Sequence, residues 1–184
     1  SNPFQLVWND ADGNQVILKD VYPVYHSTYA LDTQDRLWYW GSDYYGNSGL
    51  GVNTGSSINQ SNSTPTLTIS NVAQFATIDY NYPNCYVLLN DGTVHGTGFY
   101  GYGQLGIHNS DNQSSWAEMD LSALKTGEAV QKIFCGGNGS YHSFGLLTNQ
   151  GRVYTCGYNG YGQLGVGNSS NWYHLQEVPC RDEI

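Results

Sequence analysis

Short apolar runs alternate with polar turns along this chain. The run at Cys85–Leu89 is followed by Asn90-Asp91-Gly92 and then by a second alternating run up to Gly98. Similar turns fall at 33–35 and 149–151. Because Gly supplies and Asp tolerates positive φ, each of these places is predicted to be a β-hairpin.

Each hairpin has further apolar runs on both sides. Upstream runs at 72–78 and 130–135 would add one strand, and downstream runs at 65–69, 116–121 and 173–178 would add another. Four short strands in every stretch of about 55–60 residues predict a propeller blade rather than a solenoid coil. The alternating pattern excludes helices that bury one face, so we predict an all-β fold.

The chain also repeats itself. Gly157–Gly165 matches Gly98–Gly106 almost letter for letter, 59 residues later, and a looser copy begins at Gly41 and ends at Leu50-Gly51. Self-similarity at a long fixed period indicates that one structural unit was duplicated. The chain is therefore expected to contain about three repeats.

The repeated residues resemble a known family. Gln-Leu-Gly after a glycine-rich turn, preceded by His142-Ser143 and by a hairpin ending in Val153-Tyr154, is similar to the RCC1 (regulator of chromosome condensation) repeat. The similarity covers roughly residues 20–179. Repeat one departs by two extra residues before Leu50 and by lacking the Gln, and repeat two has Pro83 where the others have His. The resemblance implies four-stranded RCC1-like β-propeller blades in a partial ring, because this family typically closes seven blades.

The first residues lie outside the repeat. Residues 4–18 are predicted to form a separate β-hairpin with Asp12-Gly13 at its tip. The spacing of Asp10, Asp12 and Asn14 is also that of a calcium loop, but the closing glutamate is absent, so a plain turn is favoured. We expect four segments: the hairpin or connector at 1–19, repeat one at 20–70, repeat two at 71–124, and repeat three with the C-terminal tail at 125–184.

Three blades with an open face at each end would need neighbours. The absence of an initiator Met favours a fragment or a processed piece. We expect more blades in the same polypeptide or copies of this chain to cover the ends. The apolar residues expected to be partly uncovered in an isolated monomer are Val130, Ile133, Phe144, Leu146, Val153 and Leu164.

The charge is strongly negative. The net charge is −9 with only six Lys and Arg, so nucleic acid is excluded as a partner because phosphate binding needs clustered basic residues. The founding member of the RCC1 family binds nucleosomes and acts as an exchange factor on the GTPase Ran. Neither activity maps onto residues of this chain.

The four cysteines show neither CxxC nor metal-ligand spacing. They are Cys85, Cys135, Cys156 and Cys180. Free thiols are favoured over a disulfide, and a metal site is the weakest alternative, which fits folding in a reducing cell, including that of a virion component made in its host. No secretory signal or transmembrane run is visible in the sequence, and we expect no cofactor and no membrane insertion.

Catalytic motifs are missing as well. The sequence lacks a GxSxG elbow, HExxH, a P-loop and a dinucleotide fingerprint. His26 and His142 share one repeat position, which favours packing between blades over a catalytic pair. We therefore expect a non-enzymatic protein without hydrolase, transferase or nucleotide-binding activity.

Aromatic turns remain as candidate contact sites, because Tyr among Gly, Ser and Asn is typical of recognition surfaces. The candidate binding residues are Tyr44, Phe99, Tyr100, Tyr158, Trp172 and Tyr173. Tyr45, Tyr102 and Tyr161 occur once per repeat at one position and are instead predicted to pack between blades.

Function is predicted only in outline. The low charge and the Asn/Ser/Thr/Gly/Tyr-rich composition favour a structural or adhesion module of a phage tail fibre or similar surface appendage, in a virion or outside the cell. Its partner would be a protein or glycan receptor or neighbouring subunits. One alternative is an intracellular, cytoplasmic RCC1-like regulator that docks a protein such as a small GTPase. Another is a secreted RCC1-like inhibitor.

Overall fold

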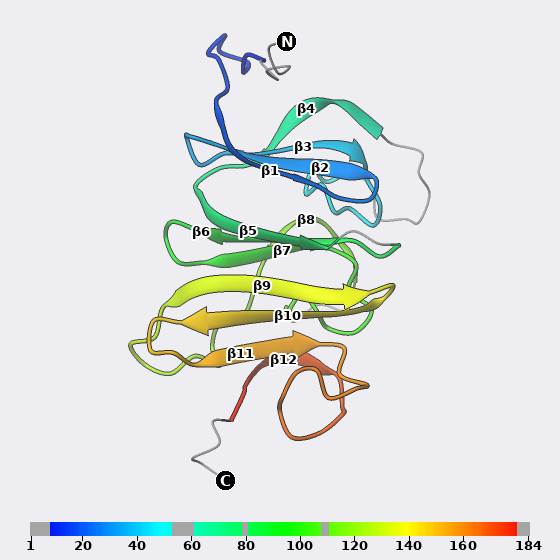
Figure 1. Ribbon diagram of the computed structural model, residues 1–184, viewed down its shortest axis with the longest axis vertical. Helices are drawn as coiled ribbons and strands as arrows, with labels where there is room; N and C mark the ends of the chain where they lie inside the picture. The colour runs from blue at the N-terminus through cyan, green and yellow to red at the C-terminus, as the bar shows by residue number, and fades with distance from the viewer. Residues whose placement is uncertain (1–7, 53–60, 79–80, 108–110, 180–184) are drawn as a thin grey trace, which may run out of the picture.

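The computed structural model describes residues 8–52, 61–78, 81–107 and 111–179 (Figure 1). These residues form strands and turns, without a helix. Accordingly, nothing in the described part of the chain has the helical length and apolar character needed to cross a bilayer. The predicted all-β fold is confirmed.

The described residues form twelve strands in three antiparallel sheets, and each sheet keeps the order of the chain. We call the sheets blades one, two and three. Blade one contains β1 (Leu18–Pro23), β2 (Ser27–Asp32), β3 (Leu37–Ser42) and β4 (Ser61–Ile69). Blade two contains β5 (Val72–Ile78), β6 (Asn84–Leu89), β7 (Val94–Gly98) and β8 (Gln113–Glu118). Blade three contains β9 (Val130–Asn138), β10 (Tyr141–Thr148), β11 (Val153–Gly157) and β12 (Trp172–Glu177).

The predicted hairpins join the second and third strands of each blade. Turns occupy 33–35, 90–92 and 149–151, as the Gly and Asp residues there predict. Gly92 and Gly151 have φ values of 92° and 80°, which is the left-handed region that favours glycine. Because β1 begins at Leu18, we propose that the division between the N-terminal hairpin and repeat one falls just before that residue.

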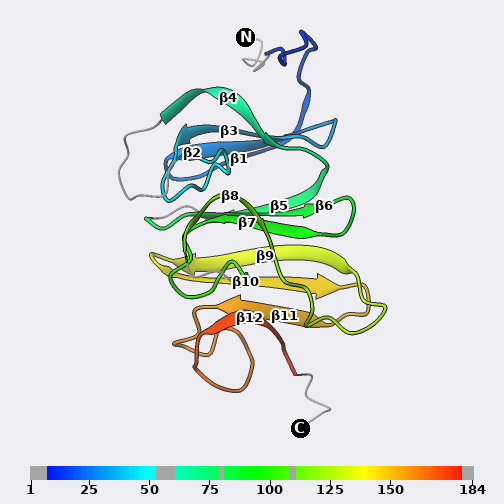
Figure 2. The same cartoon turned by 180° about the vertical axis from the view of Figure 1, so that it is seen from behind.

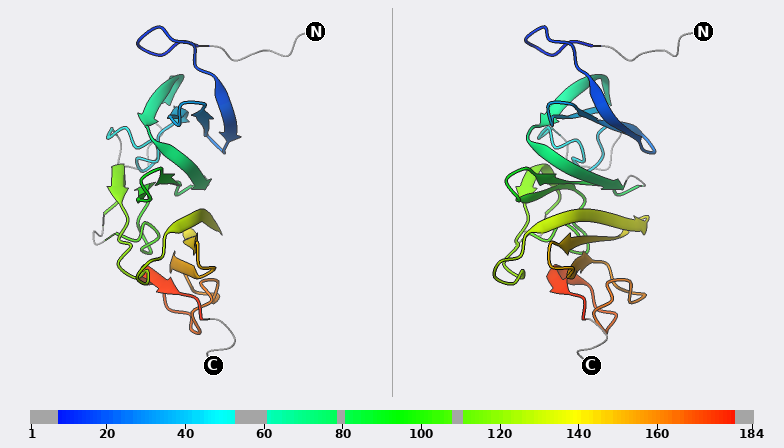
Figure 3. Two further views of the ribbon diagram at one scale, coloured as in Figure 1. Left: turned by 90° about the vertical axis from the view of Figure 1, so that its left-hand side faces the viewer. Right: turned by 60° about the vertical axis from the view of Figure 1, so that its left-hand side comes forward.

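The blades are stacked in a row with blade two in the middle, so the described chain begins at one end of the stack and finishes at the other (Figures 1 and 2). The first strands converge on one side, where β5 packs beside β9. The fourth strands lie on the other side (Figure 3). This fan of sheets is the arrangement of part of a propeller ring, with the first strands innermost.

Apolar side chains fill both seams between the blades. The seam between blades one and two contains the buried residues Tyr29, Leu31, Leu37, Tyr39, Val72, Cys85 and Val87. The seam between blades two and three is built around Tyr86, Leu88, Val94, Phe144, Leu146 and Tyr154. Full burial of a large apolar side chain contributes about 1.5–3 kcal/mol, so the seams hold the blades together.

The expectation that six apolar residues of repeat three would be partly uncovered is wrong for four of them. Ile133, Phe144 and Leu146 are buried because they face blade two. Leu164 is buried against its own blade, where its carbonyl oxygen accepts a 2.8 Å hydrogen bond from Thr155 Oγ1. Val130 and Val153 are half-buried, as expected.

The described part of the N-terminal hairpin has the predicted turn. Asn9 and Gln15 form an antiparallel bridge. Asp10 Oδ1 accepts hydrogen bonds from the backbone N–H groups of Asp12 (3.1 Å) and Asn14 (2.9 Å). This Asx-type geometry explains the Asp and Asn spacing by local turn formation. Residues 4–7 of the predicted hairpin lie outside the described residues.

Candidate interaction surface

One edge of the three blades is lined with aromatic side chains. The turns between first and second strands and the glycine-rich loops after the third strands meet at this edge, because neighbouring strands are antiparallel (Figure 1). We call this set the aromatic rim; its members are Tyr25, His26, Tyr44, Tyr45, Tyr82, Phe99, Tyr102, Tyr141, Tyr158 and Tyr161.

At the first seam the rim is a cluster of three rings. Tyr45 of blade one stacks on Tyr82 of blade two, with ring centroids 5.3 Å apart, and meets Phe99 edge-on at 5.4 Å. Tyr82 and Phe99 are 4.6 Å apart. Aromatic pairs at these distances contribute about 0.5–1.5 kcal/mol beyond their buried area, so the cluster fastens the two blades at their edge.

The second seam repeats the cluster. Tyr102 of blade two lies 5.1 Å from Tyr158 and 5.9 Å from Tyr141 of blade three, and the latter two rings are 4.5 Å apart. The prediction that Tyr45 and Tyr102 pack between blades is confirmed. For Tyr161 it is wrong: that side chain is 85% exposed, because blade three is the last sheet among the described residues.

Glycines at the ends of the third strands let the rim loops approach closely. Gly98 has a φ of 108°, and a Cβ at that position would overlap the carbonyl oxygen of Pro83. The same carbonyl accepts a 3.0 Å hydrogen bond from the backbone N–H of Phe99, which places the Phe99 ring at the seam. Gly157 has the matching geometry, with a φ of 109°. This explains why the same repeat position is glycine in both blades.

The long loop of blade three is organised by a buried asparagine. Asn159 is fully buried, and its Oδ1 accepts a 2.9 Å hydrogen bond from the backbone N–H of Leu164. Its Nδ2 donates to the carbonyl oxygens of Asn168 and Ser170. A fully satisfied buried amide fixes one loop conformation, so Tyr158 and Tyr161 are held on an ordered support.

His142 lies below the rim in the second seam. It is fully buried, and its Nδ1 is 3.1 Å from Asn84 Oδ1 across the two blades. The Asn84 side chain donates through Nδ2 to the carbonyl oxygen of Phe99 at 2.6 Å, so its Oδ1 accepts and His142 Nδ1 carries the proton. Burial lowers the His142 pKa to about 4. The predicted packing role therefore fits His142, whereas His26, at the same repeat position, is exposed on the rim 5.6 Å from Tyr44.

The candidate contact residues lie in different surroundings. Phe99 and Tyr158 belong to the two seam clusters and are half-buried, and Tyr44 lies against His26. Tyr173 on β12 is exposed, and Trp172 beside it is half-buried. These five can contribute surface to a partner.

Tyr100 is the exception among the candidates. Its side chain is only 6% exposed and packs in the core of the second seam, and its hydroxyl donates to the carbonyl oxygen of Ile107 at 3.3 Å. The variation of this position among repeats therefore reflects packing. Tyr100 is not available as a surface contact.

Sequence reasoning missed three members of the rim. Tyr25 and Tyr82 each lie two residues before the second strand of their blade, and Tyr141 is the first residue of the second strand of blade three. Their shared repeat position was the available signal, since Tyr82 and Tyr141 receive the seam tyrosine of the preceding blade.

The basic residues of the described chain lie on the opposite edge. They are Lys19, Arg36, Lys125, Lys132 and Arg152. Arg36 and Arg152 follow the β2–β3 and β10–β11 turns, and the starts of β1 and β9 pair with the strand ends beside those turns. All but Lys132 are in ion pairs with acidic side chains. The aromatic rim therefore carries no basic side chain among the described residues.

The ionic cluster around Glu128 on that opposite edge is structural. Glu128 accepts hydrogen bonds from Tyr154 Oη (2.7 Å), the backbone N–H of Lys125 (2.8 Å) and Arg152 Nη1 (3.0 Å). Burial acts to raise the Glu128 pKa, but these donors outweigh it and hold the pKa at about 2. The cluster fastens the connection after blade two to the β10–β11 hairpin.

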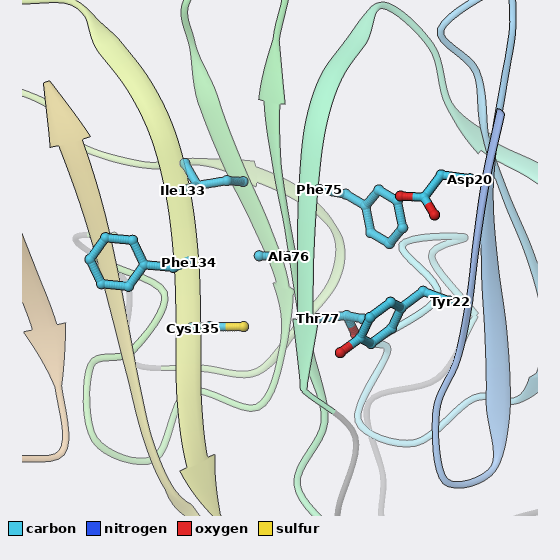
Figure 4. A pocket seen from close by; sticks show the side chains of 8 residues that line it. All are labelled: Asp20, Tyr22, Phe75, Ala76, Thr77, Ile133, Phe134 and Cys135. Carbon is cyan, nitrogen blue, oxygen red and sulfur yellow. The ribbon is translucent and has the colours of Figure 1, made fainter. Parts of the chain in front are cut away.

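A pocket of about 300 Å³ lies between the first strands of the three blades (Figure 4). Its lining residues are Asp20, Tyr22, Phe75, Ala76, Thr77, Ile133, Phe134 and Cys135. Ile133 and Cys135 point toward β5, while Phe134 points away from it. The polar side chains of the lining are Asp20, Tyr22 and Thr77. Burial raises the Cys135 pKa to about 12, so its thiol is a poor nucleophile at neutral pH.

Among the described residues, the remaining cysteines and the other metal-ligating side chains do not form a reactive site either. Cys85, Cys135 and Cys156 are free thiols, and burial raises the pKa values of Cys85 and Cys156 as well. Cys180 lies outside the described residues. Within the described part of the chain, no three His, Cys, Asp or Glu side chains gather in a way that could hold a metal ion.

Part of the chain matches a known family of repeats. Residues 130–163 and 150–181 match sequence profiles of the regulator of chromosome condensation (RCC1) repeat. The chain belongs to the RCC1 repeat family. The seam tyrosines, strand-end glycines and Gln-Leu-Gly loops described above are thus features of its RCC1 repeats.

Relatives and solved structures extend the similarity over most of the chain. The mouse (Mus musculus) probable E3 ubiquitin-protein ligase HERC4 is 30% identical over 84% of this chain. Human WBSCR16 superposes with a TM-score of 0.67 at 25% identity over 95% of the chain. Prp20p of Saccharomyces cerevisiae superposes with a TM-score of 0.68 over 90% of it, at 15% identity, which shows the shared fold alone.

The chain spans only part of these proteins. It covers 14% of the length of HERC4, 42% of the WBSCR16 chain and 39% of the Prp20p chain. The RCC1 fold is therefore shared, while the activities of the whole relatives are separate questions.

Proposed function

We propose that this chain is a protein-docking module of the RCC1 type, and that a protein partner binds on the aromatic rim. The observation that carries the proposal is the separation of the two edges: exposed and half-buried aromatic rings on one, and every basic side chain of the described residues on the other. Rigid aromatic rings supply large contact areas at a small entropic cost, which suits a protein surface.

Two rim features support recognition as well as packing. Tyr161 and Tyr25 are strongly exposed while neighbouring rings fix the loops around them. A Cβ at Gly160 would overlap the Tyr158 hydroxyl, so the ring of Tyr158 lies flat across its own loop. An ordered surface loses little conformational entropy on binding, which favours affinity.

The relatives support the regulator alternative better than the tail-fibre expectation. They include a ubiquitin ligase, the kinase Nek9 of Xenopus laevis and a secretion-regulating guanine nucleotide exchange factor of Bos taurus. Prp20p is described for its binding to Gsp1p and histones, and yeast RCC1 has been solved with Kap60 bound. We therefore propose an intracellular role in a larger regulatory assembly, with free thiols that suit a reducing compartment.

Docking does not imply catalysis. We keep the expectation that the chain itself is not an enzyme, because Cys85 and Cys156 are buried, desolvation raises the Cys135 pKa to about 12, and His142 is enclosed in the seam. We also keep the expectation that nucleic acid is not bound, since four of the five described basic residues are neutralised by ion pairs.

Site-specific photo-crosslinking tests the docking edge. A photoreactive phenylalanine analogue replaces Tyr161 on the rim in one protein, and Gln150 in the β10–β11 turn on the opposite edge in another. Each protein is exposed to lysate of its own cells, the crosslinked protein is identified and purified, and its affinity for the unmodified chain is measured by calorimetry. We expect a crosslink from position 161 and none from 150.

Substitutions then locate the contact. Tyr161→Ser should weaken binding of the purified partner at least tenfold, because rigid aromatic anchors carry most interface energy. Gln150→Ser on the opposite edge is the matched control and should leave the affinity unchanged. Crosslinking from position 150 alone would contradict the proposal. Binding to a glycan array without a protein crosslink would instead favour the adhesion alternative.

A further inference from the structure

The N-terminal hairpin (residues 8–16) covers the outer face of blade one. Trp8 meets Trp38 edge-on at 5.6 Å and Trp40 at 6.1 Å. Val16 is buried together with Ala30 and Trp38 in an apolar cluster separate from both seams. Asp10 Oδ2 accepts a 2.8 Å ion-pair hydrogen bond from Arg36 in the β2–β3 turn. The hairpin is thus fastened to the face of blade one that points away from blade two.

The corresponding face of the other blades is where the preceding blade docks. The second and third strands pair in the same register in all blades, so Ala30 corresponds to Val87 and Leu146. Val87 packs into the seam with blade one, and Leu146 packs into the seam with blade two. The hairpin therefore occupies the place that a preceding blade takes elsewhere in the molecule.

The face of blade three that points away from blade two resembles the faces that pack together in the two seams. Phe134 is 40% exposed and points away from blade two (Figure 4). It pairs with Gly145 and covers it, because a Cβ there would overlap the Phe134 ring. The matching pair in blade two is Ala76 and Tyr86, and Tyr86 meets Phe144 of blade three at 4.6 Å. Phe134 thus presents a ring where blade two presents Tyr86.

We propose that the N-terminal hairpin is a cap that keeps the blade-three face of one molecule from docking on the blade-one face of another. When the cap is released, the occupant of the blade-one face is blade three of a second copy of this chain. Within the described part of the chain the two faces lie at opposite ends of the stack and do not meet (Figure 1). Their contact is head-to-tail and therefore links copies into chains or rings.

The choice of occupant follows from continuity with the existing seams. If blade three of one molecule docks on blade one of the next, Tyr161 reaches the aromatic rim of that next molecule. Tyr45 and Tyr102 make the same kind of contact with blades two and three within one molecule. Tyr161 is the seam tyrosine that has no following blade among the described residues. A second copy thus supplies the same kind of contact that the molecule already makes twice.

The cap has the features of a releasable element. Its buried apolar cluster is much smaller than either seam, and its turn at Asp12-Gly13 is exposed. Elements with few buried apolar groups and exposed backbone open locally before the rest of the fold. Loss of the Asp10–Arg36 pair or of Trp8 is therefore expected to free the hairpin while the blades stay folded.

Sedimentation velocity of the full chain across a hundredfold concentration range tests the proposal. The double variant Trp8→Ser/Val16→Ser removes the apolar contacts of the cap. We expect it to self-associate with concentration, whereas the wild type stays monomeric. Ile17→Ser is the matched control, because Ile17 borders the hairpin but is 58% exposed, and it should behave as the wild type.

A second set of variants separates docking from aggregation. Adding Phe134→Ser and Tyr161→Ser to the double variant should restore the monomer, because these side chains form the proposed docking face. Association that persists in this quadruple variant would overturn the proposal, as would a folded double variant that stays monomeric. If circular dichroism shows that Trp8→Ser/Val16→Ser unfolds, Asp10→Asn takes its place. A folded Asp10→Asn protein whose hairpin amides exchange faster without any association would likewise overturn the proposal.

Discussion

The neutral imidazole of His142 is a buried polar group in the second seam, just below the aromatic rim. Its Nδ1 has a partner in Asn84, while Nε2 has no hydrogen-bond partner among the described residues. Protonation would place a charge where burial already lowers the pKa to about 4. The side chain therefore stabilises the seam by shape and by one hydrogen bond, and only while it stays neutral.

The first prediction concerns pH. Between about pH 6.5 and pH 4 the unfolded imidazole takes up a proton and the folded one does not, so stability falls as the pH is lowered. From the folded pKa of about 4, we expect a loss of about 2 kcal/mol between pH 7 and pH 5 that is due to His142. Urea unfolding at both pH values, compared between the wild type and His142→Gln, measures it.

The matched control for this titration is His26→Gln, at the same repeat position but exposed. It should keep the pH dependence of the wild type, while His142→Gln should flatten it. A His142→Gln protein with an unchanged pH dependence would show that His142 takes up its proton in the folded state as readily as in the unfolded one.

The second prediction concerns the glycine that ends β7. Gly98→Ala combines a φ of 108° with overlap on the Pro83 carbonyl, so we expect a loss of roughly 2–4 kcal/mol. Gly92→Ala has a similar φ of 92° in open space and should cost only about 1–2 kcal/mol. Gly136→Ala, in open space without positive φ, should be nearly neutral. Thermal unfolding of the three variants ranks their losses of stability. Equal losses of stability for Gly98→Ala and Gly92→Ala would contradict the argument from close approach to the Pro83 carbonyl.

At the scale of elements, one tyrosine position in the rim loops has two roles: it packs between blades, or it is exposed to a partner. Tyr45 and Tyr102 reach across a seam to the turn before the next second strand, and Tyr161 has the same place in blade three. The energetic role of this tyrosine is therefore set by whether a blade follows it. Identical repeat positions can thus be structural in one blade and available for binding in another.

The third prediction compares two of these tyrosines. Tyr102→Ala removes ring contacts with Tyr141 and Tyr158 and should destabilise the fold by about 1–2 kcal/mol. Tyr161→Ala, at an 85% exposed side chain, should change stability by less than about 0.5 kcal/mol. Urea unfolding of both variants provides the comparison. A larger loss for Tyr161→Ala would mean that its ring already packs against part of the chain.

The elements themselves were predictable, because hairpin turns and alternating runs are local signals. The turn at 90–92 and the strand Val72–Ile78 occur where the sequence places them. The sequence did not predict which face of a strand is covered by another blade, because an alternating pattern defines two faces but does not show what packs against each. Phe144 was expected at an open end and is buried against blade two. The burial of Tyr100 is a case of the same kind.

The cap could not be found from the repeat pattern either. Trp8 packs on Trp38, thirty residues further along, and this contact has no periodic signature. The one signal in the sequence was the gathering of Trp8, Trp38 and Trp40 within the first 40 residues, when the whole chain has five tryptophans. The packing partner of a non-repeated segment that lies far away in the sequence can be identified only from the three-dimensional structure.

At the scale of the whole molecule, stability depends on nearest neighbours. Blade two has an apolar seam on each face, blade three has one seam, and blade one has a seam and the small hairpin cluster. In a linear array of repeats, stability is approximately a sum of repeat terms and interface terms. The middle blade should therefore be the last part to open, and the hairpin the first.

The fourth prediction follows from this order and is measured by native-state hydrogen exchange with mass spectrometry. Peptides from β6 and β7 should exchange most slowly, peptides from β10 and β11 next, and residues 8–16 fastest. The substitution Phe144→Ala leaves a cavity in the larger seam, so it should speed exchange in blades two and three more than in blade one. Ile17→Ser, at an exposed position, is the control and should leave the order unchanged. Equal protection of all three blades would show a single cooperative unit, and the nearest-neighbour account of this RCC1 array would then be wrong.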